Sequence, residues 1–276
     1  MPYEFIPEIV HAKLLEEREK AAIAVKHCNR EYEGDIKSKG DRVKILTPGE
    51  VELFDYVRNQ DMGDPQLLDD SAQYLDITES RAFQYYLDDV DKKQMDKAAA
   101  FESAHIRNAA YKLADYADQF VFSKYTDAGE TITYSTFTSA NVLDLLAKAD
   151  AAMRRANVPE SETKYLEISP EVYVKFVLAK ILKDTDNSKT VETGRVGKLW
   201  GLDIYVSNNI HSDDGVYYCL VRTKRAIAYA EQLNQSEVIR HPKRFGDIHR
   251  GLMLCGAKVV VPKELICIAV KPSNET

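Results

Sequence analysis

The feature that most constrains the fold is a long helical pattern over residues 94–125. Apolar residues recur there at three- and four-residue steps, the spacing of one face of an α-helix, and no proline or glycine interrupts the run. The recurring residues are Met95, Ala98, Ala99, Ile106, Ala109, Ala110, Leu113, Ala117, Phe120 and Val121. Such a helix spans about 48 Å at 1.5 Å per residue, more than most globular helices. We therefore expect it to act as a strut.

The residues before this helix, 41–90, have the pattern of extended chain. Residues 43–47 and 51–56 flank a Pro-Gly turn, while 72–78 and 81–87 are rich in aromatic and β-branched residues. The stretch that joins these two halves is acidic and rich in turn-forming residues. A two-stranded excursion is only marginally stable alone in water. We therefore expect this hairpin-like segment to lie on another surface.

The rest of the chain mixes helices and strands without an internal repeat. Residues 8–27, which follow Pro7, have an amphipathic helical pattern and are interpreted as an N-terminal arm. Further helices are expected at 138–157 and 170–182, and strands at 163–169, 198–210, 216–223 and 226–232, with a tail of mostly strand from 236 to 272. This order predicts an α+β fold.

Composition narrows the function classes. The 276 residues include 37 basic and 44 acidic side chains, a net charge of −7, which disfavours a dedicated nucleic-acid binder because such proteins carry the opposite sign on the binding face. The four cysteines form no CxxC pair and are expected to be reduced core residues of a cytoplasmic protein. The sequence shows no signal-peptide pattern and no apolar run long enough to span a membrane.

Catalytic and metal-binding motifs are absent from the sequence. There is no GxSxG, HExxH or GxGxxG. Residues 194–199 lack the spacing and hydroxyl of a phosphate loop, and the loop that begins at Asp184 has Lys189 and Arg195 where a calcium loop needs glycine and glutamate. We predict no catalytic, cofactor-binding or metal-binding residues, and therefore not an enzyme. A cytoplasmic α/β enzyme with a site assembled from distant residues remains an alternative.

The order of several short segments carries a resemblance to a known family. In the C-terminal third these segments are Gly197-Lys-Leu-Trp-Gly-Leu-Asp-Ile-Tyr-Val, Ala226-Ile-Ala-Tyr-Ala-Glu-Gln, Lys243-Arg-Phe-Gly-Asp and Arg250-Gly-Leu-Met-Leu-Cys-Gly-Ala-Lys. Towards the N-terminus they are Phe5-Ile-Pro-Glu-Ile, Asn29-Arg-Glu-Tyr-Glu-Gly, Gly40-Asp-Arg-Val, Thr47-Pro-Gly and Asp88-Asp-Val-Asp. Each segment is weak alone, but the ordered set covers nearly the whole chain and resembles tailed-phage major capsid proteins with the fold named after coliphage Hong Kong 97.

The resemblance implies a division of the chain into parts of a shell subunit. Residues 1–33 would be an N-terminal arm, and 34–92 an extended loop that crosses a neighbouring subunit. Residues 93–137 and 237–276 would form a peripheral domain around the long helix. Residues 138–236 would form an axial domain.

The resemblance also implies function and partners. The subunit would assemble with itself into pentamers and hexamers of an icosahedral shell that encloses the phage genome, in the virion, after assembly in the host cytoplasm. A separate scaffolding protein is expected because the arm begins within the first ten residues, and a portal protein is expected as well. Decoration proteins are left open. An encapsulin-like nanocompartment, with the same fold around an enzyme cargo, is the alternative within this class.

Charge patterning suggests how the extended loop binds. Residues 50–91 hold twelve acidic and two basic residues, net −10, whereas residues 222–258 hold eight basic and three acidic residues, net +5. We hypothesise that the acidic loop of one subunit docks on a basic strip of the next. The acidic residues are Asp61, Asp64, Asp69 and Asp70, and the basic residues are Arg240, Lys243, Arg244 and Arg250. Residues 50–91 contain no lysine, so we expect shells without lysine cross-links from this loop.

Overall fold

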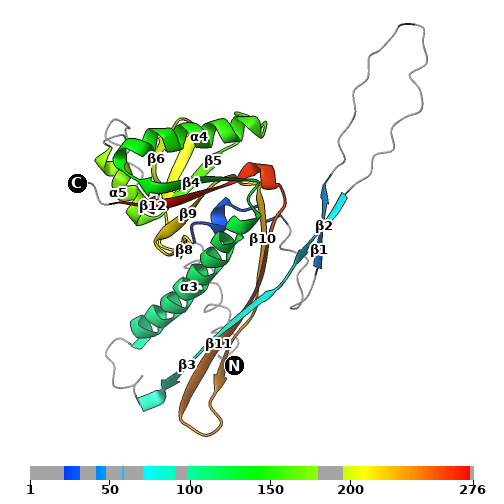
Figure 1. The fold of residues 1–276 in the computed structure, drawn as a ribbon. Helices are drawn as coiled ribbons and strands as arrows, with labels where there is room; N and C mark the ends of the chain where they lie inside the picture. Colours follow the sequence, from blue (N-terminus) through cyan, green and yellow to red (C-terminus); the bar gives the residue numbers. More distant parts are fainter. Residues whose placement is uncertain are drawn as a thin grey trace.

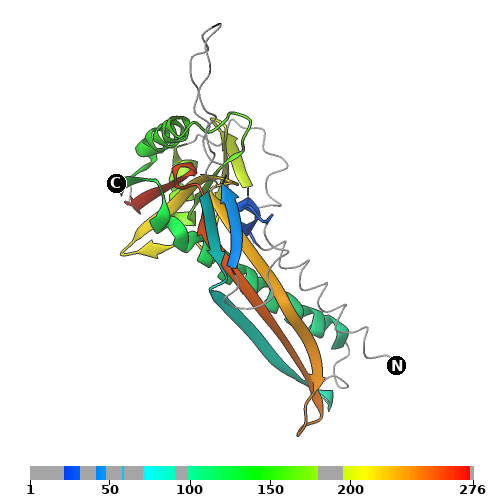
Figure 2. The ribbon, with the colours of Figure 1, turned by 90° about the vertical axis from the view of Figure 1, so that its right-hand side faces the viewer.

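Two sheets of different shape organise the chain. The structure, a computed structural model, describes residues 22–31, 42–47, 58, 71–90, 98–179 and 195–273. A mixed seven-stranded sheet forms the upper body in Figure 1, and a narrow three-stranded sheet projects from it beside one long helix. The two views show that the helix and the narrow sheet run along the same direction (Figures 1 and 2).

The seven-stranded sheet has the order β4-β12-β9-β5-β7-β6, with β8 paired to β9. Its strands are β4 (Glu130–Phe137), β5 (Lys164–Ile168), β6 (Arg195–Leu199), β7 (Leu202–Val206), β8 (Ser212–Asp213), β9 (Val216–Thr223) and β12 (Leu265–Pro272). β4 is parallel to β12 and β5 is parallel to β7, while the other neighbours are antiparallel. The β6–β7 turn contains Trp200 and Gly201, both with positive φ. Residues 195–199 are therefore a strand that turns into β7, and no phosphate-binding helix follows them.

Both faces of this sheet are buried, and strand alternation decides which side chain meets which layer. Ile266 and Ile268 pack in one core with the helices α4 (Val142–Arg155) and α5 (Pro170–Leu178). The intervening Cys267 packs in a second core with the long helix α3 and the narrow sheet. Ser169 caps α5 by accepting a hydrogen bond from Val172 N, at 3.3 Å.

The narrow sheet has the order β10-β11-β3, with β10 (Ile227–Arg240), β11 (Gly246–Val259) and β3 (Glu79–Asp88) all antiparallel. Met253 and Cys255 of β11 pack towards α3. Leu254, between them, packs with Val43 and Leu75 of the ribbon formed by β1 (Arg42–Thr47) and β2 (Ser71–Asp76). The helix therefore covers one face of the narrow sheet and the ribbon covers part of the other.

The predicted strut is confirmed as α3, Ala98–Phe122, followed by a 3-10 turn, Ser123–Asp127. Its 25 residues span about 37 Å, less than the expected 48 Å because the described α-helix begins at Ala98 and changes to the 3-10 turn at Ser123. Ile106, Ala110 and Leu113 lie on the buried face. The small alanines on this face allow the helix backbone to approach the sheet closely.

Most of the other expected elements are confirmed, with two clear differences. The expected strand at 198–210 is divided by the turn at Trp200 and Gly201 into the antiparallel strands β6 and β7. The expected short strand at 226–232 is the beginning of a 14-residue strand, β10, whose partner β11 is equally long. The expected helix over 8–27 falls largely outside the described residues, and its described end is a 3-10 turn, Val25–His27. The expected extended segment 51–56 also lies outside them.

Sheet membership does not coincide with the expected domain boundaries. β12 comes from the stretch assigned to the peripheral domain, yet it pairs with β4 and β9 in the seven-stranded sheet. Most of β10 comes from the stretch assigned to the axial domain, yet it pairs with β11 in the narrow sheet. The chain crosses between the two sheets near residue 227 and again near residue 260, because β12 returns to fill the place between β4 and β9.

Candidate assembly surface

The far end of the narrow sheet is a tight tip formed by residues 241–245, which join β10 to β11. Backbone contacts hold this tip against β3. The carbonyl oxygen of Phe245 accepts hydrogen bonds from Asp89 N at 3.2 Å and from the Tyr86 hydroxyl at 2.9 Å. A Cβ atom at Gly246 would lie 2.3 Å from Leu87 O, so a glycine is required there. The Phe245 side chain is 79% exposed on this fixed backbone.

Arg240 of the expected basic strip is neutralised within its own chain. Its guanidinium donates to both carboxylate oxygens of Asp89, one of them at 2.8 Å, and to Asp247 Oδ1 at 3.2 Å. These hydrogen bonds, first that to Asp89, raise the pKa of Arg240 above its usual range. Arg240 therefore braces the tip against the end of β3.

The remaining basic residues do not form one strip with Arg240. Arg250 pairs with Glu237 of its own hairpin. The register places Arg240 opposite Asp247 and Arg250 opposite Glu237, so strand alternation puts the two arginines on opposite faces. Lys243 and Arg244 are exposed at the tip. The expected acidic partners Asp61, Asp64, Asp69 and Asp70 lie outside the described residues.

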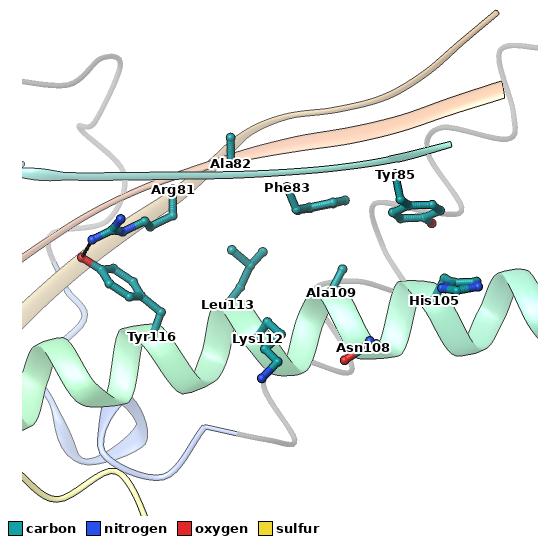
Figure 3. A pocket seen from close by; sticks show the side chains of 10 residues that line it. All are labelled: Arg81, Ala82, Phe83, Tyr85, His105, Asn108, Ala109, Lys112, Leu113 and Tyr116. Atoms are coloured by element: carbon teal, nitrogen blue, oxygen red, sulfur yellow. Dashed lines mark hydrogen bonds between the residues drawn. The ribbon is translucent and has the colours of Figure 1, made fainter. Parts of the chain in front are cut away.

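A groove between β3 and α3, with a volume of about 470 Å³, is a second surface feature (Figure 3). Phe83 and Tyr85 of β3 point towards the helix. Ala109 and Leu113 of the helix form the apolar floor of the groove. At one end, Arg81 donates a 2.8 Å hydrogen bond to the Tyr116 hydroxyl.

Stacked rings hold α3 to the narrow sheet at the other end of the groove. Tyr85 of β3 stacks on His249 of β11, with ring centroids 4.8 Å apart, and on His105 of α3, at 5.5 Å. The stack joins three elements that are distant in sequence. His105 is therefore a packing residue.

A buried ionic cluster joins residues 22–31 to the seven-stranded sheet. Arg222 of β9 is fully buried and donates to Glu167 of β5 through Nε at 2.9 Å and Nη2 at 2.8 Å. It also donates to the carbonyl oxygens of His27 at 2.8 Å and Ala24 at 2.7 Å. His27 Nδ1 lies 2.8 Å from Glu167 Oε1, and its ring stacks on Tyr165. The segment is therefore fixed to the body by charge-assisted hydrogen bonds.

Asp118 of α3 holds the same segment from the other side. Its carboxylate accepts hydrogen bonds from Ile23 N at 2.8 Å and Val25 N at 3.1 Å. Burial raises the pKa of Asp118 to about 6, against these two hydrogen bonds, which lower it. Burial would also raise the pKa of Glu167, but Arg222 and His27 outweigh it and lower that pKa to about 2.

Sequence reasoning missed this cluster, although a signal was present. Glu167 and Arg222 are opposite charges inside two apolar strand patterns. A charge within a strand that is expected to be buried needs a partner, and each of these two residues is the other's partner. The groove and the exposed Phe245 carried no comparable signal, because they depend on how distant elements pack.

The described residues contain little that suggests chemistry. No group of three His, Cys, Asp or Glu side chains among them could hold a metal ion. No helix in the described part is long and apolar enough to cross a membrane. The four cysteines are buried and free, as expected, and burial raises the pKa of Cys28 to about 11 and of Cys219 to about 12. Thiols of this kind are unreactive.

Comparison with known proteins identifies what the chain is similar to. The family model described as phage capsid protein matches residues 77–247, more than half of the chain. No curated protein matches the chain.

Solved structures share the fold over nearly the whole chain. A chain from Mycobacterium phage Che8 is 25% identical, with 90% of each chain covered and a TM-score of 0.68. The capsid of cyanophage P-SCSP1u has 19% identity, 92% and 89% coverage and a TM-score of 0.68. The SrpI encapsulin of Synechococcus elongatus has 9% identity, 94% and 92% coverage and a TM-score of 0.59.

Proposed function

Because this chain belongs to the phage capsid protein family and has the Hong Kong 97-like capsid fold, we propose that it is the major capsid protein of a tailed-phage-type particle. In this proposal its copies assemble into pentamers and hexamers of an icosahedral shell around the phage genome. Its role is structural and not enzymatic. Assembly takes place in the host cytoplasm, with scaffolding and portal proteins as partners and decoration proteins left open.

The observation that carries the proposal is the shape of the subunit, together with its family. A narrow three-stranded sheet and a single long helix project from the larger sheet (Figure 2). A projection of this kind exposes a large surface relative to its own core, and a closed assembly of copies buries such surface. In this proposal the seven-stranded sheet is the axial body, and α3 with the narrow sheet is the peripheral body.

We also propose that the acidic loop of one subunit docks on the peripheral body of the next. Lys243 and Arg244 are the available cations for this contact, because Arg240 and Arg250 already have partners in their own chain. Each exposed pair contributes only about 0–1 kcal/mol. The contact is repeated around the whole shell, and complementary charge also favours the correct neighbour.

Electron microscopy of the purified protein tests the main proposal. Closed shells of even size are expected when the chain is expressed with its scaffolding partner. Nuclease-resistant DNA inside particles purified from infected or induced cells supports a genome container. Shells that hold a protein cargo and no DNA support the encapsulin alternative, which is considered because the SrpI encapsulin shares this fold. A chain that remains a monomer under all these conditions overturns both.

A further inference from the structure

Trp200, the only tryptophan of the chain, occupies a backbone position that suits few side chains. With Gly201 it forms the two-residue turn between β6 and β7, which Leu199 and Leu202 flank as a pair. Both turn residues have positive φ, 49° and 80°, as in the type I′ hairpin turn, where asparagine, aspartate and glycine are usual. A bulky residue with positive φ is strained, and such strain clusters at functional positions.

The side chain of Trp200 remains accessible in spite of this strain. It is 54% exposed, and the short turn fixes the place of its backbone. Tryptophan is enriched among the residues that contribute most to protein–protein binding, because it supplies a large contact area with few rotatable bonds. A strained, fixed and exposed tryptophan is therefore typical of an anchor for a partner.

The place of Trp200 in the fold suits a contact between subunits. The faces of the seven-stranded sheet pack on the chain's own helices, α4 and α5 on one face and α3 on the other. The edges and ends of the sheet are therefore the places where a neighbour can meet it directly. Among the described strands β6 is an edge strand, and the register puts Trp200 at the end of the sheet where β5 and β12 begin.

An exposed apolar surface lies at the opposite end of the same sheet. Val174, Val177 and Leu178 of α5 are exposed at the spacing i, i+3 and i+4, so they form one stripe on the helix surface, the α5 stripe. The helix α5 follows directly on the end of β5, after Ser169, and Figure 1 shows it near the end of β12. Two copies arranged head to tail would therefore bring Trp200 of one against the α5 stripe of the other.

We propose that Trp200 of one copy packs on the α5 stripe of a second copy, so that the seven-stranded sheets of neighbouring subunits contact head to tail. A contact between two different surfaces of one protein closes into a ring when the rotation allows it, as pentamers and hexamers require. The inference rests on the proposed function, which supplies the second copy.

The charges beside the two surfaces agree with this pairing. Lys198 is exposed two residues before Trp200. Glu171 is exposed one turn before Val174. Opposite charges beside the two halves of a contact favour the correct partner over others.

The fluorescence of Trp200 tests the inference on the natural chain, because no other tryptophan contributes. When the unassembled chain forms shells, verified by electron microscopy, we expect emission at shorter wavelength and a severalfold weaker quenching by acrylamide. Shells in which Trp200 keeps the emission and quenching of the unassembled chain would overturn the inference and leave the proposed function intact. If no shells form, the proposed function fails and the inference fails with it.

Mixed shells identify the surface that covers Trp200. One population carries Trp200→Phe and Val177→Cys, with a nitroxide on the new thiol, and the other is the natural chain. The four natural cysteines are buried and therefore react little with the label. A nitroxide quenches tryptophan only at close range, so the natural chain should lose most of its emission when labelled copies are in excess. This quenching can come only from a second copy, since the labelled copies contain no tryptophan.

The matched control carries the nitroxide at Tyr111→Cys, an equally exposed position on α3, and should leave the emission unchanged. Exclusion of the chain labelled at position 177 from shells that admit the control would support the contact, because the label would occupy the place of Trp200. Equal quenching by both labels, or none from position 177 in mixed shells, would show that another surface covers Trp200 and would overturn the proposed contact.

Discussion

Arg222 and Glu167 form a bidentate ion pair in which neither side chain is accessible to solvent. The pair links β9 to β5 inside the seven-stranded sheet, and Arg222 extends it to the backbone of residues 24 and 27. A buried charge that loses its partner keeps its desolvation cost without compensation. The pair therefore ties the backbone of residues 24 and 27 to the seven-stranded sheet, while Asp118 holds Ile23 and Val25 from α3.

We expect Glu167→Gln to lower the free energy of unfolding by about 3–5 kcal/mol, the usual cost of breaking a buried ion pair from one side. Urea unfolding of the unassembled chain, followed by circular dichroism, measures the change. The matched control is Lys148→Ala, which removes an exposed i,i+4 pair with Asp144 and should cost less than about 1 kcal/mol. Equal effects of the two substitutions would contradict the assigned role of Glu167.

The pH dependence of stability should have two parts of opposite sign. The folded-state pKa of Asp118 is raised from 3.8 to about 6, so the folded chain takes up a proton first and this group stabilises the fold as pH falls from about 7 to 4. The pKa of Glu167 is lowered from 4.5 to about 2, so its contribution is complete above pH 4.5 and is lost as pH falls towards 2.

Urea midpoints measured between pH 7 and pH 2.5 test both signs. Asp118→Asn should remove the gain in stability between pH 7 and 4, because the amide does not titrate. The variant should still lose stability below pH 4.5, since Glu167 is unchanged. A parent chain whose midpoint falls steadily from pH 7 downwards would contradict the sign assigned to Asp118.

Reversal of the two exposed cations at the hairpin tip should block assembly. Lys243→Glu with Arg244→Glu leaves the fold intact because both side chains are exposed, but it removes the charge available to an acidic neighbour. Adding Asp69→Lys and Asp70→Lys should partly restore shells. Sedimentation across a salt series gives the readout, and wild-type assembly should slow as salt rises. Normal assembly of the double reversal would mean that apolar contacts alone hold the loop.

Particles should contain no cross-links from a lysine of residues 50–91, because these residues contain no lysine. Boiled mature particles should give a single band near 31.3 kDa on a reducing denaturing gel. A ladder of multiples under these conditions would contradict the expectation and show a covalent bond that uses no lysine of residues 50–91. Empty precursor shells provide the comparison, since any maturation-dependent bond would be absent from them.

Local patterns in the sequence predicted the elements better than their pairing. The spacing of Ile106, Ala110 and Leu113 was enough for α3, because a helix face is set by neighbours in the chain. The length of β10 was not predicted, since polar residues near 234–236 interrupt its apolar pattern and its pairing with β11 continues past them. Strand length here is decided by a partner that the local sequence does not show.

The candidate surface shows the same limit. The positive charge of residues 222–258 was read from the sequence, but the register that sets Arg240 against Asp247 and Arg250 against Glu237 was not. Without the register, the two arginines could not be assigned to opposite faces. Local sequence patterns also could not predict the contact of Arg240 with Asp89, which lies 151 residues away in the chain.

The place of β12 between β4 and β9 has a consequence for how shells are made in the cell. β4 is complete at residue 137, but its only described neighbour in the sheet begins at residue 265. A nascent chain on the ribosome must therefore wait through more than a hundred further codons before this sheet can close, and contacts so distant in sequence form slowly. Products of premature termination before residue 265 lack the strand that joins β4 to β9 and cannot complete the seven-stranded sheet. Such fragments should be degraded by proteases and should not be incorporated into shells.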